Sequence, residues 1–311
     1  MKPDEKAFEE HIAPSLVQSG GYRTVKLGNS SGDFEAGRGL DLAELFAFIE
    51  ATQAEEWGRL AKLHGGESKA RERFADRLAR ELDARGTVDV LRHGVVDLGV
   101  RLRLAFFKPA HGLTPELVAR YEANRLTVTR QLPYEPGTNK TLDLTLFVNG
   151  VPVATAEIKN PSTGQDVEDA KKQYRETRDP RNVTLRRAVV HFAVDTEQAA
   201  MTTRLDGAST RFLPFNRGYN RGKGNPPNPR GHRTAYLWEQ VWEKDAWLDL
   251  LGRFVHVERP AKGSKFSGAV IFPRYHQWDA VIKLSAHARE HGAGESYLVQ
   301  HSAGSGKSNT I

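Results

Sequence analysis

Apolar residues recur at helical spacing over the first part of the chain. The pattern predicts a helix over residues 8–17, ended by a pair of glycines, and a loop over residues 29–39. From residue 40 to about residue 85 it predicts two helices, separated by glycines near residues 64–68. We therefore expect a helical N-terminal region.

Further along, the pattern alternates between apolar and polar positions. Residues 87–107 alternate in the manner of a β-strand. A helix is expected over residues 114–124, with Thr114 as its N-cap and Pro115 in its first turn. Residues 125–134 again predict a strand.

Two short apolar runs, at 142–148 and 151–159, flank an Asn-Gly pair and predict a β-hairpin. A polar loop then leads to a predicted helix over 166–178, and strands are expected at 188–195 and 210–216. Because helices and strands are interspersed, the sequence predicts an α/β core rather than a helical bundle.

The last part of the chain mixes a long loop with helices. Residues 217–234 are rich in Gly, Pro, Asn and basic residues, and predict a loop that is either functional or simply solvated. Residues 235–255 return to a helical pattern, and residues 258–265 predict a linker. The tryptophans of this helical stretch are expected in the core rather than in a base-stacking surface: Trp238, Trp242 and Trp247.

Composition narrows the chemistry. The chain has 311 residues and no cysteine, which excludes disulfides, thiolate zinc sites, iron–sulfur clusters and cysteine nucleophiles. No apolar run is long enough to span a membrane, and the charged N-terminus lacks the apolar centre of a signal peptide, so we expect a cytoplasmic protein. The formal charge of +6 is mild. It fits a solvated surface and is compatible with binding to a polyanion.

The predicted hairpin carries three charges within apolar strands: Asp143, Glu157 and Lys159. Two carboxylates brought together repel each other, and a hard divalent cation such as Mg²⁺ relieves that repulsion through oxygen ligands. A lysine two residues from the glutamate can orient or deprotonate a water molecule, so this set fits phosphodiester hydrolysis. The alternative is an edge hairpin that turns its charges to solvent.

The register of the hairpin distinguishes the two interpretations. A two-residue turn at Asn149-Gly150, counted back along both strands, places Asp143 opposite Ala156. Glu157 would then lie on the other face, and the metal site would fail. The carboxylates converge only if the strands slip by one residue. Because a proline follows the turn closely and cannot donate to a β-ladder, we predict a bulge or a longer turn within residues 150–154.

Several stretches together resemble one family. "LDLTLFVNGVPVATAEIKNP" (142–161) is similar to the hairpin of PD-(D/E)xK nucleases, in the form found in the restriction (R) subunit of type I restriction–modification enzymes. "DAKKQY", "HFAVDTEQAAMTTRL", "FLPFNRG" and "YLWE" follow in the order of that subunit. The resemblance implies a restriction-endonuclease-like α/β core, a mixed sheet flanked by helices, over residues 1–257. It also implies the beginning of a RecA-like motor domain over residues 258–311.

The resemblance assigns roles within the hairpin. By it, Asp143 and Glu157 would ligate Mg²⁺, the carbonyl of Ile158 would be a further ligand, and Lys159 would be the catalytic lysine. The proline that precedes the aspartate in the family is Leu142 here. Since proline is not a ligand, this departure removes nothing from the site.

Two neighbouring helices carry weaker correspondences. The family often has Gln-x-x-x-Tyr on the helix after the hairpin: Gln173 fits and would contact DNA, but Thr177 stands at the tyrosine position. Tyr174, beside the glutamine, is a poor candidate for a DNA contact. In some relatives a glutamate of the first helix assists the metal, here Glu9 or Glu10, although a solvated helix face is the expected environment.

The C-terminal "AGSGKS" resembles the phosphate loop of superfamily 2 helicases and translocases, with His301 where the full pattern has its first glycine. Residues 296–300 before it predict a strand. "FPRYHQWDAV" (272–281) resembles the adenine-reading motif of the same motors. The residues that would bind ATP and its Mg²⁺ are then Gln277, Gly304, Gly306, Lys307 and Ser308.

The favoured interpretation is the Mg²⁺-dependent endonuclease module of a type I R subunit, which cuts double-stranded DNA after ATP-driven translocation by the intact subunit. We expect a fragment that does not translocate by itself, because the sequence ends soon after the phosphate loop. Modification and specificity subunits would be its partners, and its DNA contacts would be mostly to phosphate. Two alternatives remain open: a catalytically silent DNA clamp of an ATP-dependent motor, and an assembly module that docks to the methyltransferase core.

Overall fold

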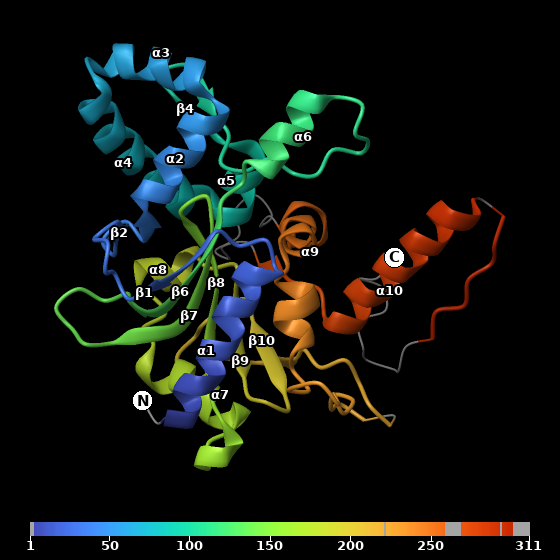
Figure 1. Ribbon diagram of the computed structural model, residues 1–311. Coiled ribbons are helices and arrows are strands. Elements are labelled where there is room, and N and C mark those ends of the chain that lie inside the picture. The colour runs from blue at the N-terminus through green and yellow to red at the C-terminus, as the bar shows by residue number, and fades with distance from the viewer. Residues whose placement is uncertain (1–2, 221, 259–268, 293, 301–311) are drawn as a thin grey trace.

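The computed structural model describes residues 3–220, 222–258, 269–292 and 294–300. A seven-stranded mixed sheet runs through the centre of the molecule, with helices on both faces (Figure 1). β1 pairs with β6 and β8 pairs with β9 in parallel, whereas the other neighbours are antiparallel. The strands, in spatial order, are β1 (Thr24–Leu27), β6 (Leu126–Pro133), β7 (Thr141–Val148), β8 (Val151–Ile158), β9 (Val190–Val194), β10 (Ala199–Thr202) and β11 (Leu213–Pro214). The predicted α/β class, a mixed sheet flanked by helices, is confirmed.

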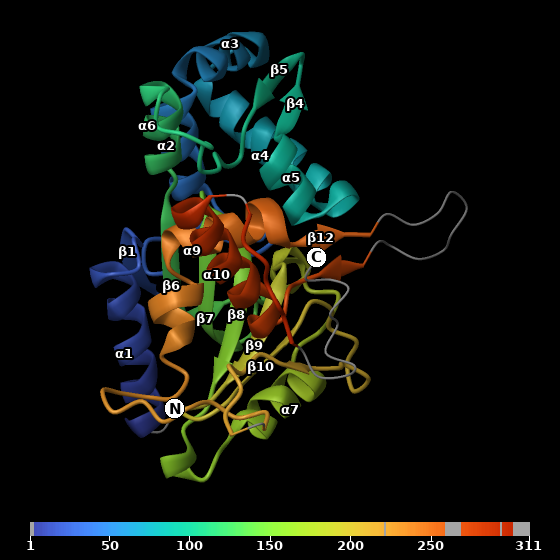
Figure 2. The ribbon, with the colours of Figure 1, turned by 90° about the vertical axis from the view of Figure 1, so that its right-hand side faces the viewer.

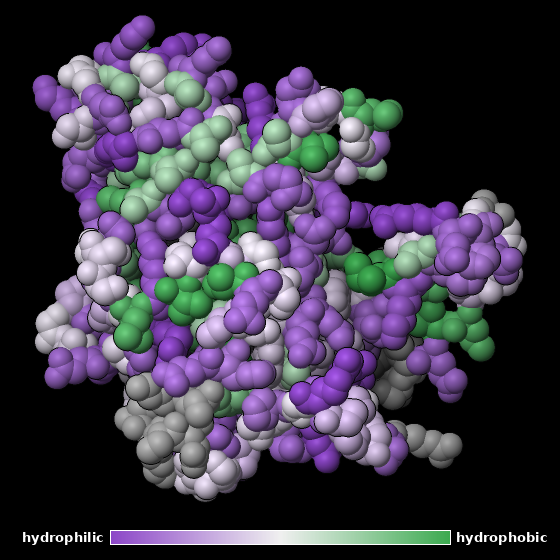
Figure 3. All heavy atoms as spheres, viewed as in Figure 1, coloured by the Kyte–Doolittle hydropathy of each residue, from purple (hydrophilic) through white to green (hydrophobic). Residues whose placement is uncertain are grey.

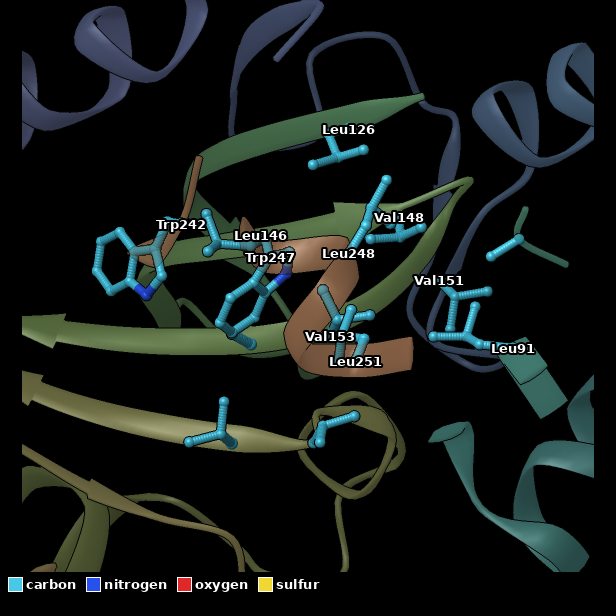
Figure 4. Packing of buried hydrophobic residues seen from close by; sticks show 14 of the residues in the cluster. Leu91, Leu126, Leu146, Val148, Val151, Val153, Trp242, Trp247, Leu248 and Leu251 are labelled. Atoms are coloured by element: carbon cyan, nitrogen blue, oxygen red, sulfur yellow. The ribbon is translucent and has the colours of Figure 1, made fainter. Parts of the chain in front are cut away.

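Different helices cover the two faces of the sheet. Helices α1 (Pro3–Gln18) and α7 (Val167–Thr177) lie on opposite sides of it (Figure 2). The π-helical turns η2 (Leu237–Val241) and η3 (Leu250–Phe254), with α9 (Lys244–Asp249) between them, pack into the same apolar core as α1. Figure 4 shows this core at the hairpin, where side chains of α9 and η3 lie against those of β7 and β8. The helix α8 (Val183–Arg187) precedes β9.

A group of helices is inserted between β3 (Leu40–Asp41) and β6, and lies at one end of the sheet, at the top of Figure 1. We call residues 42–124 the helical insertion. The small strand β2 (Phe34–Glu35) pairs with β3 just before it. The elements of the helical insertion are α2 (Leu42–Thr52), α3 (Ala54–His64), α4 (Glu67–Arg85), α5 (Thr87–His93), β4 (Val95–Asp97), β5 (Val100–Leu102) and α6 (Pro115–Glu122).

The turn of the hairpin fixes this insertion to the sheet. The Gly150 carbonyl accepts a hydrogen bond from the Asp41 amide at 2.9 Å, and Asn149 Oδ1 accepts one from the Arg125 amide at 2.7 Å. Both turn residues have positive φ, 51° at Asn149 and 78° at Gly150. A Cβ on Gly150 would approach the Asp41 carbonyl oxygen to 2.2 Å, so glycine is required there for close packing as well as for the turn.

The structure corrects the strand predicted over residues 87–107. That segment begins with helix α5, and only two short strands, β4 and β5, follow it. The alternation was misleading because Val88, Val90 and Leu91 are all buried in the insertion, whereas an isolated strand would bury one face only. Gly94, with a φ of 72°, ends the helix.

Other elements were predicted with partial success. The stretch expected to hold two helices over residues 40–85 holds three, because α2 ends at Thr52 with Gln53 as its C-cap, a break that the sequence pattern did not mark. The helical stretch over residues 235–255 is broken by π-helical turns, and its three tryptophans are buried as expected. The helices predicted over 8–17 and 166–178 are confirmed as α1 and α7. The predicted helix over 114–124 is confirmed as α6, with Pro115 at its first position.

The C-terminal part differs from expectation in one respect. Residues 296–300, predicted as a strand, have no regular structure, because no neighbouring strand in the described part of the chain pairs with them. Leu298 is 94 % exposed there, and Figure 3 shows apolar side chains on this arm. The segment follows β12 (His256–Val257), β13 (Val270–Ile271) and α10 (Tyr275–His291).

Two predicted features fall wholly or largely outside the described residues. The linker at 258–265 does so except for Glu258. The phosphate-loop residues do so entirely: Gly304, Gly306, Lys307 and Ser308. Within the described ranges, no helix combines the length and apolar character that crossing a bilayer requires.

Candidate active site

A bulge in β8 brings the charged residues of the hairpin together. Phe147 pairs with Pro152 and Leu146 pairs with Ala154, so Val153 has no partner across the ladder. The two-residue turn is therefore kept, and the slip of one residue occurs three residues after it, within the predicted range of 150–154. The prediction of a bulge is confirmed.

The bulge reverses which residues of β8 face the main core. Before it, Val151 and Val153 belong to the core on the α1 side; after it, Ala154, Ala156 and Ile158 do. Thr155 and Glu157 are thereby turned to the α7 side of the sheet. In a regular strand Glu157 would share a face with Val153, and the bulge separates the two. The pairing of Leu144 with Ala156, continued by one residue, sets Asp143 opposite Glu157.

Asp143 lies at the junction of the hairpin strands. Its Oδ2 accepts a hydrogen bond from the Ile158 amide at 2.8 Å, and the Nζ of Lys159 lies 3.8 Å from the same oxygen. Both side chains are buried, at 8 % and 7 % exposure. Asp143 and Lys159 thus share one small volume at the end of β8.

Glu157 is completely buried and is held by Arg178, the C-cap residue of α7. Nε of Arg178 donates to Oε1 of Glu157 at 2.7 Å, and Nη2 lies 2.7 Å from the same oxygen. Nη2 also donates to the Thr141 carbonyl at 2.7 Å, so Arg178 ties the start of β7 to the end of β8. Burial, followed by the charge of Asp143, raises the pKa of Glu157 to about 8 against the opposing effect of Arg178.

A third carboxylate, Glu9 of α1, reaches the same end of the sheet. It is fully buried, and its Oε1 accepts a hydrogen bond from Nε2 of Gln131 at 2.7 Å. The same Nε2 lies 3.4 Å from Oδ1 of Asp143, so Gln131 bridges the two acids. Burial, and then the charge of Asp143, raises the pKa of Glu9 to about 8. Glu10 is exposed, so the solvated environment expected for this pair holds for Glu10 only.

Gln131 adopts an unusual backbone conformation for a residue in a strand. Its φ is 50°, in the left-handed region that non-glycine residues seldom occupy. Its side chain also accepts a hydrogen bond from Thr141 Oγ1 at 2.8 Å. Backbone strain of this kind costs on the order of 1–3 kcal/mol and persists where surrounding contacts enforce it, commonly at functional sites.

The donor set fits a hard divalent cation. Oε2 of Glu9 and Oε2 of Glu157 are both buried and accept no hydrogen bond from the described residues, although Nε of Arg130 lies 3.5 Å from Oε2 of Glu9, and each oxygen belongs to a carboxylate with a raised pKa. Such oxygens are costly unless a cation compensates them. Among the residues that the structure describes, no three acidic or histidine side chains converge closely enough to enclose a cation by themselves. Mg²⁺ does not require this, since it keeps several waters and uses one or two carboxylates.

A buried polar network supports the site from the α7 side. Oγ1 of Thr155 lies 2.7 Å from the hydroxyl of Tyr174 and 2.7 Å from Nδ1 of His191. Burial lowers the pKa of His191 to about 3, so the imidazole is neutral. The network attaches α7 to the sheet and so fixes the position from which Arg178 reaches Glu157. Tyr174 is buried, in agreement with the weak DNA-contact role expected for it.

The remaining predicted residues lie apart from the carboxylates. Gln173 is half-buried on α7, and within the described ranges no hydrogen bond joins its side chain to the site. Gln277 is buried, and its Oε1 accepts a hydrogen bond from the Arg274 amide at 2.8 Å, so it caps α10 instead of lying exposed on the helix. Ile158 uses its amide to hold Asp143, and a ligand role for its carbonyl stays a prediction.

Sequence reasoning missed Arg178 and undervalued Glu9. The buried residues Val167, Ala170 and Tyr174 follow helical spacing along α7, and one further step of four reaches Arg178. A charge on an otherwise apolar stripe is the signal that indicates a buried partner. Glu9 likewise stands directly beside Phe8 in α1, but its neighbour Glu10 gave no means of choosing between the two.

The comparisons with known proteins agree with this geometry. No curated protein matches the chain. A family model described as "Type I restriction enzyme R protein N terminus" matches residues 3–210, a range that includes the whole hairpin, α1 and α7. The chain therefore belongs to the family of type I restriction enzyme R protein N-terminal regions.

Proposed function

We propose that this chain is the Mg²⁺-dependent endonuclease module of a type I restriction enzyme R subunit, and that it hydrolyses phosphodiester bonds of double-stranded DNA. The observation that carries the proposal is the bulge at Val153, which sets Asp143 opposite Glu157 and places both beside Lys159. A hairpin that served the fold alone would have no use for these charges on one face. Membership of the R protein family supports a restriction nuclease in general terms.

Asp143 and Glu157 would hold the cation, with the Ile158 carbonyl as a further ligand and Glu9 close by. When bound, Mg²⁺ supplies Lewis-acid polarisation of the scissile phosphate and neutralises the carboxylates. Arg178 keeps Glu157 in position, and the Ile158 amide does the same for Asp143. These contacts make the carboxylates a rigid platform before DNA arrives.

Lys159 provides the positive charge that the hydrolysis step needs. Its ammonium would orient the attacking water and stabilise the negative charge that grows on the phosphate oxygens. Water adds to phosphorus, the bond to the leaving oxygen breaks, and that oxygen takes up a proton. The products are a phosphate end and a hydroxyl end.

In the intact subunit, ATP-driven translocation would precede cleavage, and modification and specificity subunits would supply recognition and methylation. The ATP-binding residues would be Gln277, Gly304, Gly306, Lys307 and Ser308. Contacts from this chain to DNA would be mostly to phosphate and would weaken with salt.

The test is Mg²⁺-dependent DNA cleavage by the full-length R subunit reconstituted with its partner subunits. We expect Asp143→Ala or Lys159→Ala to abolish cleavage while ATP hydrolysis persists. Lys172→Ala is the matched control, because Lys172 is an exposed lysine of α7 and should leave cleavage unchanged. Undiminished cleavage in both site variants would reject the proposal, and the catalytically silent clamp would then be favoured.

A further inference from the structure

A second group of charges lies in the helical insertion. The insertion adjoins the hairpin turn at one end of the sheet (Figure 1), whereas Asp143 and Glu157 lie toward the other end of β7 and β8. A pocket of about 570 Å³ opens in the insertion between α3, α5, β5 and α6. Four exposed arginines line it: Arg59, Arg101, Arg103 and Arg120. We call it the arginine pocket.

The arginines of this pocket are not neutralised by neighbouring acids. Nη1 of Arg101 donates to the His93 carbonyl at 3.0 Å, and Nη1 of Arg103 donates to the Arg92 carbonyl at 3.1 Å. The guanidinium of Arg120 lies 5.6 Å from the centre of the Phe106 ring. Among the described residues, no carboxylate forms an ion pair with any of the four, although Glu56 contributes to the lining.

This excess of positive charge is local. Residues 42–124 contain thirteen acidic and thirteen basic residues, so the insertion as a whole is neutral. On α4 the charges compensate one another: Arg71 pairs with Glu50 and Glu67, and Arg77 pairs with Glu81. A pocket with four uncompensated guanidiniums on a neutral subdomain is typical of a site for an anion.

The pocket is also built before any ligand binds. Gln53 is buried, accepts a hydrogen bond from the Arg103 amide at 2.6 Å and donates to the Arg103 carbonyl at 3.0 Å. These bonds fix the backbone that carries Arg101 and Arg103. Because the two residues are separated by one position in an extended segment, their side chains project to the same side. The carbonyl contacts occupy only part of each guanidinium, which has five N–H donors.

The extent of the positive surface favours a polymer over a small anion. A shallower pocket adjoins the first, shares Arg59 with it and is also lined by Lys62. Five cations spread over two adjoining pockets exceed what one phosphate needs. Arginine forks match phosphate oxygens, and a nucleic-acid backbone presents such groups in regular succession.

We propose that the arginine pocket binds the phosphate backbone of duplex DNA, as a contact separate from the carboxylate site and independent of cleavage. DNA that contacts both the arginine pocket and the carboxylate site would be held in position while cleavage takes place at the carboxylates. The contact would be independent of sequence, because it involves phosphates and no base edges.

The experiment measures binding of the 311-residue chain to a fluorescent 30-base-pair duplex in EDTA, over a range of salt concentrations. We expect Arg101→Gln/Arg103→Gln/Arg120→Gln to weaken binding at least about tenfold near 0.1 M salt. The slope of log K against log salt should fall by about two to three, since each lost phosphate contact removes about 0.9. The variant with lysine at the same three positions keeps the charges and should therefore keep most of the salt slope. Retention of the slope would show that substitution at these positions does not by itself disrupt the fold.

The matched control removes the same charge from another surface of the insertion. Lys69, Arg73 and Arg80 are exposed residues of α4 outside the pocket, so Lys69→Gln/Arg73→Gln/Arg80→Gln should leave the slope unchanged. Equal losses in both triple variants would overturn the proposal.

Two further measurements separate the sources of phosphate and the two sites. ATP and inorganic phosphate are titrated separately against the wild-type chain and against the triple glutamine variant. If the variant loses the binding of either compound but retains binding to the duplex, the pocket is a nucleotide or phosphate site. That outcome would show that the proposal is wrong. Because the duplex titration is carried out in EDTA, no cation is bound at the carboxylates and the measurement does not depend on cleavage. Failure of the nuclease proposal would therefore leave this result in place.

Discussion

At the end of the sheet away from the hairpin turn, Glu157 and Arg178 are buried and form an ion pair, whereas Arg101 and Arg120 of the helical insertion lie on the surface and have no ion-pair partner among the described residues. Buried charges of the first kind respond to protonation and to metal, because desolvation penalises whichever charge lacks a partner. Exposed charges of the second kind respond to salt and to polyanions. One chain thus contains two charged regions, one rich in carboxylates and one rich in arginines, that different experiments can distinguish.

The largest expected effect tests whether the site depends on the register that the bulge sets. Insertion of one alanine between Ala154 and Thr155 would undo the slip of one residue, place Ala156 opposite Asp143 and turn Glu157 toward the apolar core on the α1 side. We expect a loss of more than about 4 kcal/mol in the free energy of unfolding, because an unpaired carboxylate would be buried there. Urea denaturation measures it.

The matched control is insertion of one alanine after Gly137, in the loop between β6 and β7, where a Cβ on Gly137 would meet nothing within 4 Å. That insertion should cost no more than about 1 kcal/mol. A β8 insertion variant that unfolds at the wild-type urea concentration and still cleaves DNA would show that the register set by the bulge does not unite the carboxylates.

Removal of Arg178 should have the next largest effect. Arg178→Met leaves Glu157 buried without its ion-pair partner, which costs about 3–5 kcal/mol when the carboxylate is charged. The loss should be smaller at pH 5, where Glu157 takes up a proton. Arg181→Met, at an arginine whose side chain is 90 % exposed and paired with Asp179, should leave the free energy of unfolding nearly unchanged. Similar losses for the two variants at pH 8 would remove the contrast between buried and exposed charge.

The pH dependence of stability should come from the buried carboxylates. The pKa values of Glu9 and Glu157 are raised to about 8 in the folded state, so their protonated forms favour folding. This contribution is complete below about pH 4.5 and is lost as the pH rises through about 8, by an amount on the order of a few kcal/mol. In EDTA, the free energy of unfolding should decline over that range.

Saturating Mg²⁺ should flatten the decline, since a bound cation favours the charged carboxylates. Glu9→Gln and Glu157→Gln should each remove part of it, whereas Glu10→Gln, at an exposed position, should not. A curve that is level in EDTA would contradict the assigned pKa shifts.

Gln131 provides a smaller test of the same region. Gln131→Ala loses the hydrogen bonds to Glu9 and Thr141 but keeps a side chain at a φ of 50°. Gln131→Gly loses the same bonds and relieves the backbone strain. We therefore expect the glycine variant to be more stable than the alanine variant by about 1 kcal/mol. The reverse order in thermal denaturation would show that the conformation is not strained.

The smallest effect is expected in the arginine pocket. Arg101→Gln and Arg120→Gln should each change the free energy of unfolding by no more than about 0.5 kcal/mol, because both side chains are exposed and have no ion-pair partner among the described residues. A cost of 2 kcal/mol or more in urea denaturation would assign these arginines a structural role and weaken the contrast with Arg178.

The sequence was informative where a local rule was violated. Charges inside apolar strands, next to a turn and a proline, were enough to predict the bulge in β8 and the meeting of Asp143 with Glu157. Helices with strong periodicity and caps, such as α7 with its capping box at Asp166, were also predictable. In these cases the determining interactions lie within about twenty residues of one another.

Features assembled from distant segments could not be predicted in this way. The arginine pocket draws on residues from Gln53 to Arg120 in several elements, and nothing in their spacing indicates that they meet. The α5 segment was mistaken for a strand because burial on every side imitates alternation. The bridge from Glu9 through Gln131 to Asp143 joins three elements, and only the folded chain shows it.

The two bonds that the hairpin turn makes have a consequence for protein engineering. The Asp41 amide and the Arg125 amide, where the chain enters and leaves the helical insertion, bind the adjacent residues Gly150 and Asn149. The ends of the insertion are therefore close together, which is the condition under which domains can be excised or exchanged. A short linker across this junction would yield a smaller chain that keeps the sheet and the candidate site, and another domain with neighbouring termini could be grafted in place of the insertion.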